Sequence, residues 1–167
     1  AFSALTDGLV IQMGYPRFDR YFNERVDRHA LCGRFGCDPA KETVVWLPTW
    51  KELSSVGYFD DEISALSDRY NVVVKLHPLM SEAEPARVES LRRHHFSCLL
   101  TDSTDNLPLY QLADYMLFDF GGPPLAAPGK AAVEFGLDQR GYLDTVDAQG
   151  TVGLGQPGRI DVRAVQL

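Results

Sequence analysis

The sequence has no long apolar run, no excess of basic residues and few cysteines, and each shortage excludes a class of protein. Its longest suggestive apolar piece, residues 115 to 118, is strand-sized and far below the roughly 18 residues that a membrane span needs. The 16 Lys and Arg residues against 23 Asp and Glu give a net charge of −7, which argues against a nucleic-acid surface. The first residues lack the basic and apolar regions of a secretory signal. We therefore expect a globular protein that neither crosses a membrane nor binds nucleic acid.

The 3 cysteines, Cys32, Cys37 and Cys98, form no pair of CxxC motifs of the zinc-binding type. Reduced thiols are the expected state in a cytoplasmic protein. Cys32 and Cys37 lie in the segment Leu-Cys-Gly-Arg-Phe-Gly-Cys, for which we expect a plain loop. A local disulfide and half of a metal site are the alternatives for this segment.

The length of 167 residues fits one domain, residues 1–167, with a proper hydrophobic core. Short β-branched or aromatic runs alternate with amphipathic stretches, and the run at 43–47 is continuous, as in a strand that is covered on both faces. We expect strands at 9–13, 43–47, 71–76, 97–100 and 115–118, and helices at 18–31, 60–70, 84–95 and 107–113. This alternation predicts an α/β fold, a three-layer Rossmann-like parallel sheet with helices on both faces.

The sequence after residue 120 is harder to interpret. A turn-rich passage precedes a weak strand at 131–135, residues 136–167 have no clear assignment, and 160–165 alternates like an edge strand. The segment 153–158 matches G-x-G-x-x-G, but it opens no helix within a βαβ unit, so we interpret it as a turn.

Polar and permissive residues follow four of the expected strands. In an open α/β sheet, ligands bind beyond the carboxyl ends of the strands, where loop amides and helix N-termini converge. We therefore predict a ligand site at this edge, with His77 and Asp119 emerging from neighbouring strands as its catalytic residues. The residues at this edge that we predict to bind a nucleotide or phosphate are Thr49, Trp50, Lys51, Lys75, Asp102, Ser103, Gly121 and Gly122.

Each of the main candidates also has a purely structural interpretation. His77 fits a general base or, when protonated, a charge stabiliser beside a phosphate, but a histidine at a strand end can also simply bind a backbone group. Lys75 is two residues earlier, so it points to the same side and makes a cationic edge with His77. Asp119 orients a hydroxyl or a histidine, or forms a turn or helix cap. Gly121 and Gly122 let amides approach a phosphate, or form only a turn.

Four motifs resemble a known family. They are Gly-Tyr-Pro-Arg-Phe-Asp at 14–19, Leu-Pro-Thr-Trp-Lys at 47–51, Val-Lys-Leu-His-Pro at 74–78, and the segment 109–119. In this order they resemble the C-terminal half of the CDP-glycerol glycerophosphotransferases, GT-B-type enzymes of teichoic-acid synthesis. The resemblance spans residues 9–122, about two thirds of the chain.

The resemblance implies a nucleotide-binding domain that holds a CDP-alcohol in a family that passes glycerol phosphate to a hydroxyl acceptor and releases CMP. His77 matches the family's histidine at the donor phosphates, and Asp119 matches the aspartate that opens an Asp-Tyr-Ser-Ser motif. Here the motif reads Asp-Phe-Gly-Gly, so the amides of Gly121 and Gly122 would replace two serine hydroxyls. The family's acceptor domain would precede residue 9, with residues 1–19 as the connection and first strand and Arg17 near the cleft.

No Asp-rich metal cluster is visible in the sequence, so Lys51, Lys75, protonated His77 and helix N-terminal amides would offset the donor's negative charge. This predicts metal-independent action without a cofactor, in the cytoplasm or at the inner membrane face. Two alternatives remain, since one architecture serves many chemistries: a GT-B glycosyltransferase or epimerase that uses a UDP-sugar, and a non-catalytic nucleotide-binding remnant.

Overall fold

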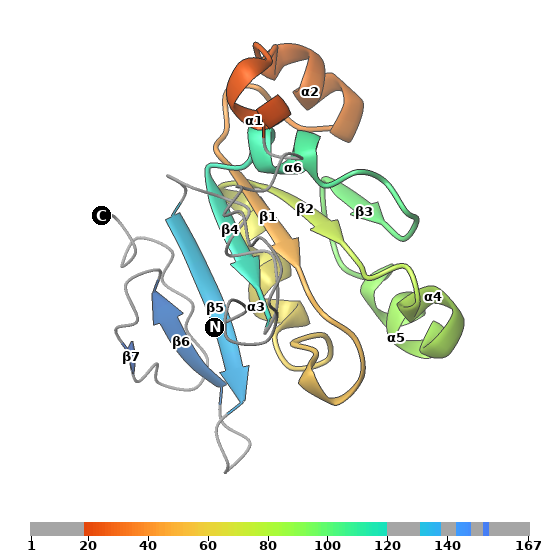
Figure 1. Cartoon of the computed structure of the whole chain (residues 1–167). Coiled ribbons are helices and arrows are strands. Elements are labelled where there is room, and N and C mark those ends of the chain that lie inside the picture. Colours follow the sequence, from red (N-terminus) through yellow and green to blue (C-terminus); the bar gives the residue numbers. More distant parts are fainter. Residues whose placement is uncertain (1–18, 120–130, 138–142, 148–151, 154–167) are drawn as a thin grey trace, which may run out of the picture.

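A computed structural model describes residues 19–119, 131–137, 143–147 and 152–153 (Figure 1). Their strands form one sheet in the order β3-β2-β1-β4-β5-β6-β7. The strands are β1 (Thr43–Leu47), β2 (Asn71–Lys75), β3 (Cys98–Leu100), β4 (Tyr115–Phe118), β5 (Ala131–Leu137), β6 (Leu143–Asp147) and β7 (Val152–Gly153). The strands β1 to β5 pair in parallel, whereas β6 and β7 join in antiparallel pairs.

Strand β1 is the centre of the parallel part. Its Val45 lies opposite Val73 of β2 on one side and Met116 of β4 on the other. All five residues of β1 and of β2 are buried, and each strand has an apolar centre, Val44–Leu47 in β1 and Val72–Val74 in β2. The predicted α/β class with a parallel sheet is confirmed.

Helices cover both faces of this sheet. The helices are α1 (Asp19–Asn23), α2 (Arg28–Phe35), α3 (Asp60–Ala65), α4 (Met80–Ala83), α5 (Pro85–Leu91) and α6 (Leu107–Leu112), with short 3-10 turns η3 (Lys51–Leu53) and η4 (Leu66–Asp68). Val45 packs with residues of α2 and α6 on one face. Val44 and Trp46 pack with residues of α3 and α5 on the other. Because neighbouring residues of a strand point to opposite faces, one short strand contributes to both hydrophobic clusters.

The expected helix over 18–31 is wrong in its bounds. It is two helices, α1 and α2, and the second begins after Asp27, whose carboxylate accepts a hydrogen bond from the N–H of Ala30. Helix α2 continues past Gly33 and ends at Gly36, which has a φ of 64°. Glycine adopts this left-handed conformation at little cost, so Gly36 rather than Gly33 terminates the helix.

The same correction changes the cysteine segment. Cys32 lies within α2 and Cys37 follows its end, so the expected plain loop is mostly helix. All three thiols are free, so the local disulfide alternative is wrong.

Other elements differ in smaller ways. The expected helices at 60–70 and 84–95 are shorter, and the former ends in the turn η4. Helix α4 and strands β6 and β7 have no counterpart among the expected elements. The weak strand at 131–135 is confirmed as β5, whereas the expected strands at 9–13 and 160–165 lie outside the described residues. None of the helices within the described ranges is both long enough and apolar enough to cross a bilayer.

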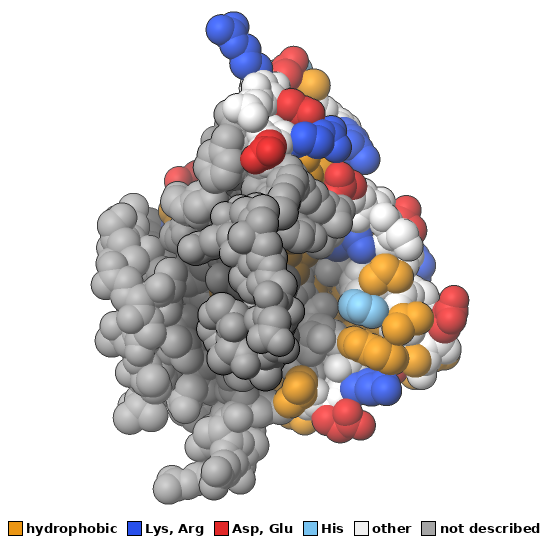
Figure 2. All heavy atoms as spheres, in the orientation of Figure 1, with side chains coloured by type: hydrophobic (Ala, Val, Ile, Leu, Met, Phe, Trp, Pro, Cys, Tyr) orange, Lys and Arg blue, Asp and Glu red, His pale blue; other side chains and the backbone are white. Residues whose placement is uncertain are grey.

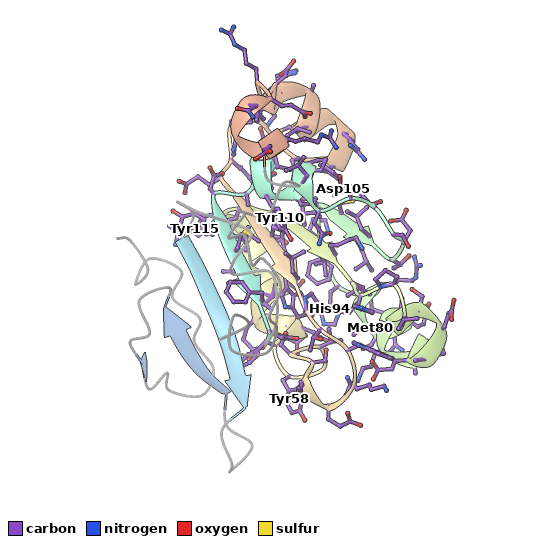
Figure 3. All side chains as sticks on the ribbon, viewed as in Figure 1. Tyr58, Met80, His94, Asp105, Tyr110 and Tyr115 are labelled. Atoms are coloured by element: carbon purple, nitrogen blue, oxygen red, sulfur yellow. The ribbon has the colours of Figure 1, made fainter. Side chains whose placement is uncertain are left out.

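Polar side chains, the buried Asn71 and the partly buried Asp114, close the amino ends of the central strands. Asn71 accepts a hydrogen bond from the N–H of Asp38, and its amide donates to the carbonyl oxygens of Asp38 and Lys41. Asp114 accepts a hydrogen bond from the N–H of Thr43 (2.8 Å) and is paired with Arg28 of α2. Figure 3 shows Tyr115 near this amino end and Tyr58 and Met80 near the opposite, carboxyl end.

Candidate functional site

The carboxyl ends of β1, β2 and β4 lie along one edge of the sheet (Figure 1). His77 follows β2 and Asp119 follows β4, so both belong to this edge as expected. The expectation that they come from neighbouring strands is wrong, because β1 lies between β2 and β4. From β1 the chain builds β2 and β3 on one side of β1 and then returns to form β4 on its other side. The topological switch point, where ligands bind in such sheets, is therefore between β1 and β4.

Asp119 bridges this switch point. Its Oδ2 accepts hydrogen bonds from the backbone N–H groups of Thr49 (2.7 Å) and Ser55 (2.9 Å), both in the loop that follows β1. The side chain is buried, and within the described part of the chain its Oδ1 has no hydrogen-bond partner. Burial raises the pKa of the Asp119 carboxyl, and the hydrogen bonds from Ser55 and Thr49 oppose that shift. The first effect of Asp119 is thus to hold the β1 loop against the end of β4.

The same loop is anchored a second time from inside the core. The indole N–H of the fully buried Trp46 donates to the hydroxyl oxygen of Ser55 at 3.0 Å. A buried Trp needs such a partner for its N–H. Ser55 therefore links the core of β1 to Asp119 and fixes the far end of the loop that carries Thr49, Trp50 and Lys51.

Trp50 lies flat on His77. Their ring centroids are 5.3 Å apart and their planes differ by 6°. The ammonium group of Lys51 lies 4.2 Å from the centroid of the Trp50 ring, within the range of a cation–π interaction. Figure 2 shows hydrophobic side chains gathered beside a histidine on the side of the molecule where Figure 1 places α4 and α5. The β1 loop and the end of β2 are thereby joined through one aromatic stack.

The hydrogen bonding of His77 defines its tautomer. The backbone N–H of Leu79 donates to Nδ1 of His77 at 3.2 Å, so Nδ1 supplies a lone pair and the ring carries its proton on Nε2. In the described residues no group forms a hydrogen bond with Nε2. His77 is half-buried, so its Nε2–H is a hydrogen-bond donor available to a bound anion.

Lys75 lies beneath the edge rather than on it. Its ammonium group donates to the carbonyl oxygens of Leu76 (3.1 Å) and Asp102 (2.6 Å), and the residue is only 6% exposed. Burial lowers the pKa of Lys75, and the nearby Asp102 opposes that shift. Lys75 thus ties the end of β2, just before His77, to the loop after β3.

Asp102 and Ser103 are exposed in that loop. The carboxylate of Asp102 accepts hydrogen bonds from the backbone and hydroxyl of Thr104, which lower its pKa. These bonds form an Asx turn within the loop.

The structure brings together five of the predicted site residues: Thr49, Trp50, Lys51, His77 and Asp119. It joins Lys75 and Asp102 to each other, whereas Arg17, Gly121 and Gly122 lie outside the described residues. The described ranges contain no group of three or more His, Cys, Asp or Glu side chains arranged to hold a metal ion. Sequence reasoning missed Ser55 and Leu79, since a loop serine and a backbone N–H carry no pattern that marks them.

Comparisons with known proteins concern the family and the fold of this chain. The profile of the family described as CDP-Glycerol:Poly(glycerophosphate) glycerophosphotransferase matches residues 2–122. Among solved structures, the wall teichoic acid polymerase TagF matches with 19% identity and a TM-score of 0.51 over 70% of this chain. Two TagF variants, one of them soaked with CDPG, match with 17% and 18% identity and TM-scores of 0.51 and 0.50. No curated protein matches the sequence.

The likeness to TagF is one of fold, since the sequences share less than a fifth of their residues. This chain spans 31% of the TagF chain that it matches. Its α/β domain, with the parallel order β3-β2-β1-β4, corresponds to one part of that larger protein. Because the family profile covers most of its length, the chain belongs to the CDP-glycerol:poly(glycerophosphate) glycerophosphotransferase family.

Proposed function

We propose that this domain binds a CDP-alcohol donor at the carboxyl edge of its sheet and serves the transfer of a glycerol-phosphate unit to a hydroxyl acceptor, with release of CMP. Family membership supports the class of donor. The observation that carries the proposal is the state of His77, whose Nε2–H is held in place through Nδ1 and stacked on Trp50. Because one hydrogen bond and one stacking contact fix the imidazole ring, its Nε2–H is suited to bind one oxygen of a diphosphate.

In the transfer, the acceptor oxygen forms a bond to the phosphorus that carries glycerol, and the bond from that phosphorus to the oxygen of CMP breaks. The acceptor proton leaves to a base or to water, and CMP departs with the electron pair of the broken bond. Negative charge develops on the CMP oxygen, so positioned donors and cations are the main source of acceleration. His77 Nε2–H and the Lys51 ammonium group supply these in the proposal.

In this scheme Asp119 and Lys75 do not contact the substrate, and they position the residues that do. Asp119 holds the backbone of Thr49 and Ser55, and Lys75 holds the carbonyl oxygen that precedes His77. A direct catalytic role for the Asp119 carboxylate stays a prediction, as does phosphate binding by Lys75, Asp102 and Ser103. We assign acceptor binding to a second, acceptor-side domain and phosphate contacts to the amides of Gly121 and Gly122, with Arg17 near the cleft.

Isothermal titration calorimetry with CDP-glycerol, CMP and UDP-glucose tests the proposal. We expect CDP-glycerol and CMP to bind more tightly than UDP-glucose, because the proposed site is matched to a cytidine-linked donor. His77→Ala should weaken CDP-glycerol binding, while His95→Ala, which replaces an exposed histidine, serves as the matched control. Tighter binding of UDP-glucose would favour a UDP-sugar enzyme instead. Equal CDP-glycerol affinity in wild type and His77→Ala would remove His77 from the site.

A further inference from the structure

We propose that Glu84 and Arg87 are positioning residues that hold Trp50 on His77 by clamping the backbone of Lys51. This inference rests on the proposed function for its catalytic meaning, but the clamp is a property of the unliganded domain. It concerns two residues on and beside α5 that no motif or strand end marks.

The clamp acts on an unfavourable backbone conformation. Lys51 has a φ of 63°, and among the described residues it is the one non-glycine residue with a positive φ. Residues with a side chain rarely adopt this region because their Cβ crowds the following carbonyl oxygen. Such a conformation persists where surrounding contacts impose it, and residues that adopt it are frequent at ligand-binding and active sites.

Besides the local bond from the N–H of Ser54 to the carbonyl oxygen of Lys51 (3.2 Å), two hydrogen bonds from α5 and the residue before it hold this conformation. The N–H of Lys51 donates to Oε2 of Glu84 at 3.0 Å, and Nη1 of Arg87 donates to the carbonyl oxygen of Lys51 at 2.9 Å. The same Nη1 of Arg87 lies 3.1 Å from Oε1 of Glu84. Both polar groups of the Lys51 backbone are therefore bound by one ion pair, whose members are three residues apart at the start of α5.

The backbone of Lys51 determines where its neighbours lie. Its ammonium group lies over the Trp50 ring, and Trp50 lies on His77. If the clamp is removed, Lys51 can relax to an ordinary negative φ and redirect the loop. Trp50 then leaves His77, whose ring loses the surface that keeps its Nε2–H aimed at the edge.

Proton NMR of the unliganded 167-residue chain tests the clamp. A ring stacked on an indole experiences its ring current, so the ring protons of His77 should resonate upfield of those of the exposed His95. The His77 signals are assigned with His77→Gln. In Arg87→Ala this displacement should be lost, and in Arg87→Lys, which keeps a cationic donor, it should be largely retained.

Arg92→Ala is the matched control, because Arg92 follows the same helix and, among the described residues, its side chain makes one contact, an exposed one of 3.9 Å with Glu89. It should leave the His77 signals unchanged. The indole N–H signal of Trp46, bound to Ser55, reports whether each variant is folded. Should Arg87→Ala not fold, Glu84→Ala, which removes the acceptor of the Lys51 N–H and the partner of Arg87, must still reduce the displacement.

Unchanged His77 signals in folded Arg87→Ala, or a loss of equal size in Arg92→Ala, would overturn the proposal. Titration of the same variants with CMP separates the two inferences. Loss of the stack with weaker CMP binding supports both. Loss of the stack with no CMP binding even in the wild type leaves the clamp standing and contradicts the proposed function.

Discussion

The carboxylate of Asp119 accepts a hydrogen bond from the backbone N–H of Thr49, 2.7 Å away, and so joins the carboxyl ends of β4 and β1. The bond crosses the switch point of the sheet, the position where this fold class binds its ligands. A second bond, from Ser55, makes the carboxylate the common anchor for both ends of the loop. The shape of the proposed donor site therefore depends on a side chain that is itself hidden from solvent.

Asp119→Ala should destabilise the domain by about 2–4 kcal/mol, because it leaves the N–H groups of Thr49 and Ser55 without their acceptor. Asp119→Asn should retain most of the stability, since its amide oxygen can accept both bonds and no buried charge remains. Urea denaturation at pH 7 measures both. Equal losses in the two variants would contradict the anchoring role.

The free energy of unfolding should depend on pH through the ionisation of Asp119. Its pKa is raised in the folded state, so the folded protein holds this proton more tightly than the unfolded chain does. The resulting stabilisation is present at low pH and is lost as the pH rises from about 4, the ordinary value for aspartate, through the raised pKa. The free energy of unfolding of the wild type, relative to Asp119→Asn, should thus fall over this range. A difference in unfolding free energy that increases with pH would contradict a raised pKa for Asp119.

Two substitutions at His77 separate its two ring nitrogens. Asn has an oxygen that can replace Nδ1 as the acceptor for Leu79, whereas Gln places an N–H near the position of Nε2. If Nε2–H binds a donor phosphate, His77→Asn should bind CDP-glycerol about 10–100-fold more weakly, the usual worth of a hydrogen bond to a charged group. His77→Gln should lose less. Calorimetry compares them, and a larger loss in His77→Gln would assign the binding contact to Nδ1 instead.

At the amino edge, Asp114→Ala should cost more stability than Arg28→Ala. Removal of Arg28 loses a partly exposed ion pair, which salt weakens, and a hydrogen bond to the carbonyl oxygen of Leu112, together about 1–2 kcal/mol. Removal of Asp114 also leaves the N–H of the fully buried Thr43 unpaired, for a total of about 2–3 kcal/mol. Thermal unfolding in low and high salt tests both parts, and a salt-sensitive loss of equal size in the two variants would argue against the backbone bond.

Cys37 should resist alkylation until the domain unfolds. Burial, with a smaller contribution from Cys32, raises the pKa of its thiol to about 12, and the thiolate is the reactive form. Iodoacetamide labelling at pH 8, followed by mass spectrometry, should modify Cys37 only slowly in the native protein and rapidly in urea. Fast native labelling would place this thiol at the surface.

The strands could be predicted from the sequence because a strand buried on both faces has an apolar centre, as residues 44–47 and 72–74 do. The helices were less predictable, since apolar spacing continues across the break before Asp27 and only the capping carboxylate marks the new start. The strand order could not be predicted, and with it the position of β1 between His77 and Asp119.

The candidate site was predictable only for residues that directly follow a strand. Lys75 has the right residue type and place, but two nearby carbonyl oxygens bind its ammonium group, and no local pattern reveals them. The contacts of Lys51 with Glu84 and Arg87 join segments more than 30 residues apart. Contacts between segments so far apart in the sequence produce no periodic pattern from which they could be predicted.

Asn71 saturates its amide with backbone partners at the end of the sheet farthest from His77. In the part of the chain that the structure describes, these bonds hold the amino ends of the strands together without any contact from the loops at the carboxyl ends. Grafting of donor-recognition loops from other members of the family onto this framework is therefore a practical engineering route.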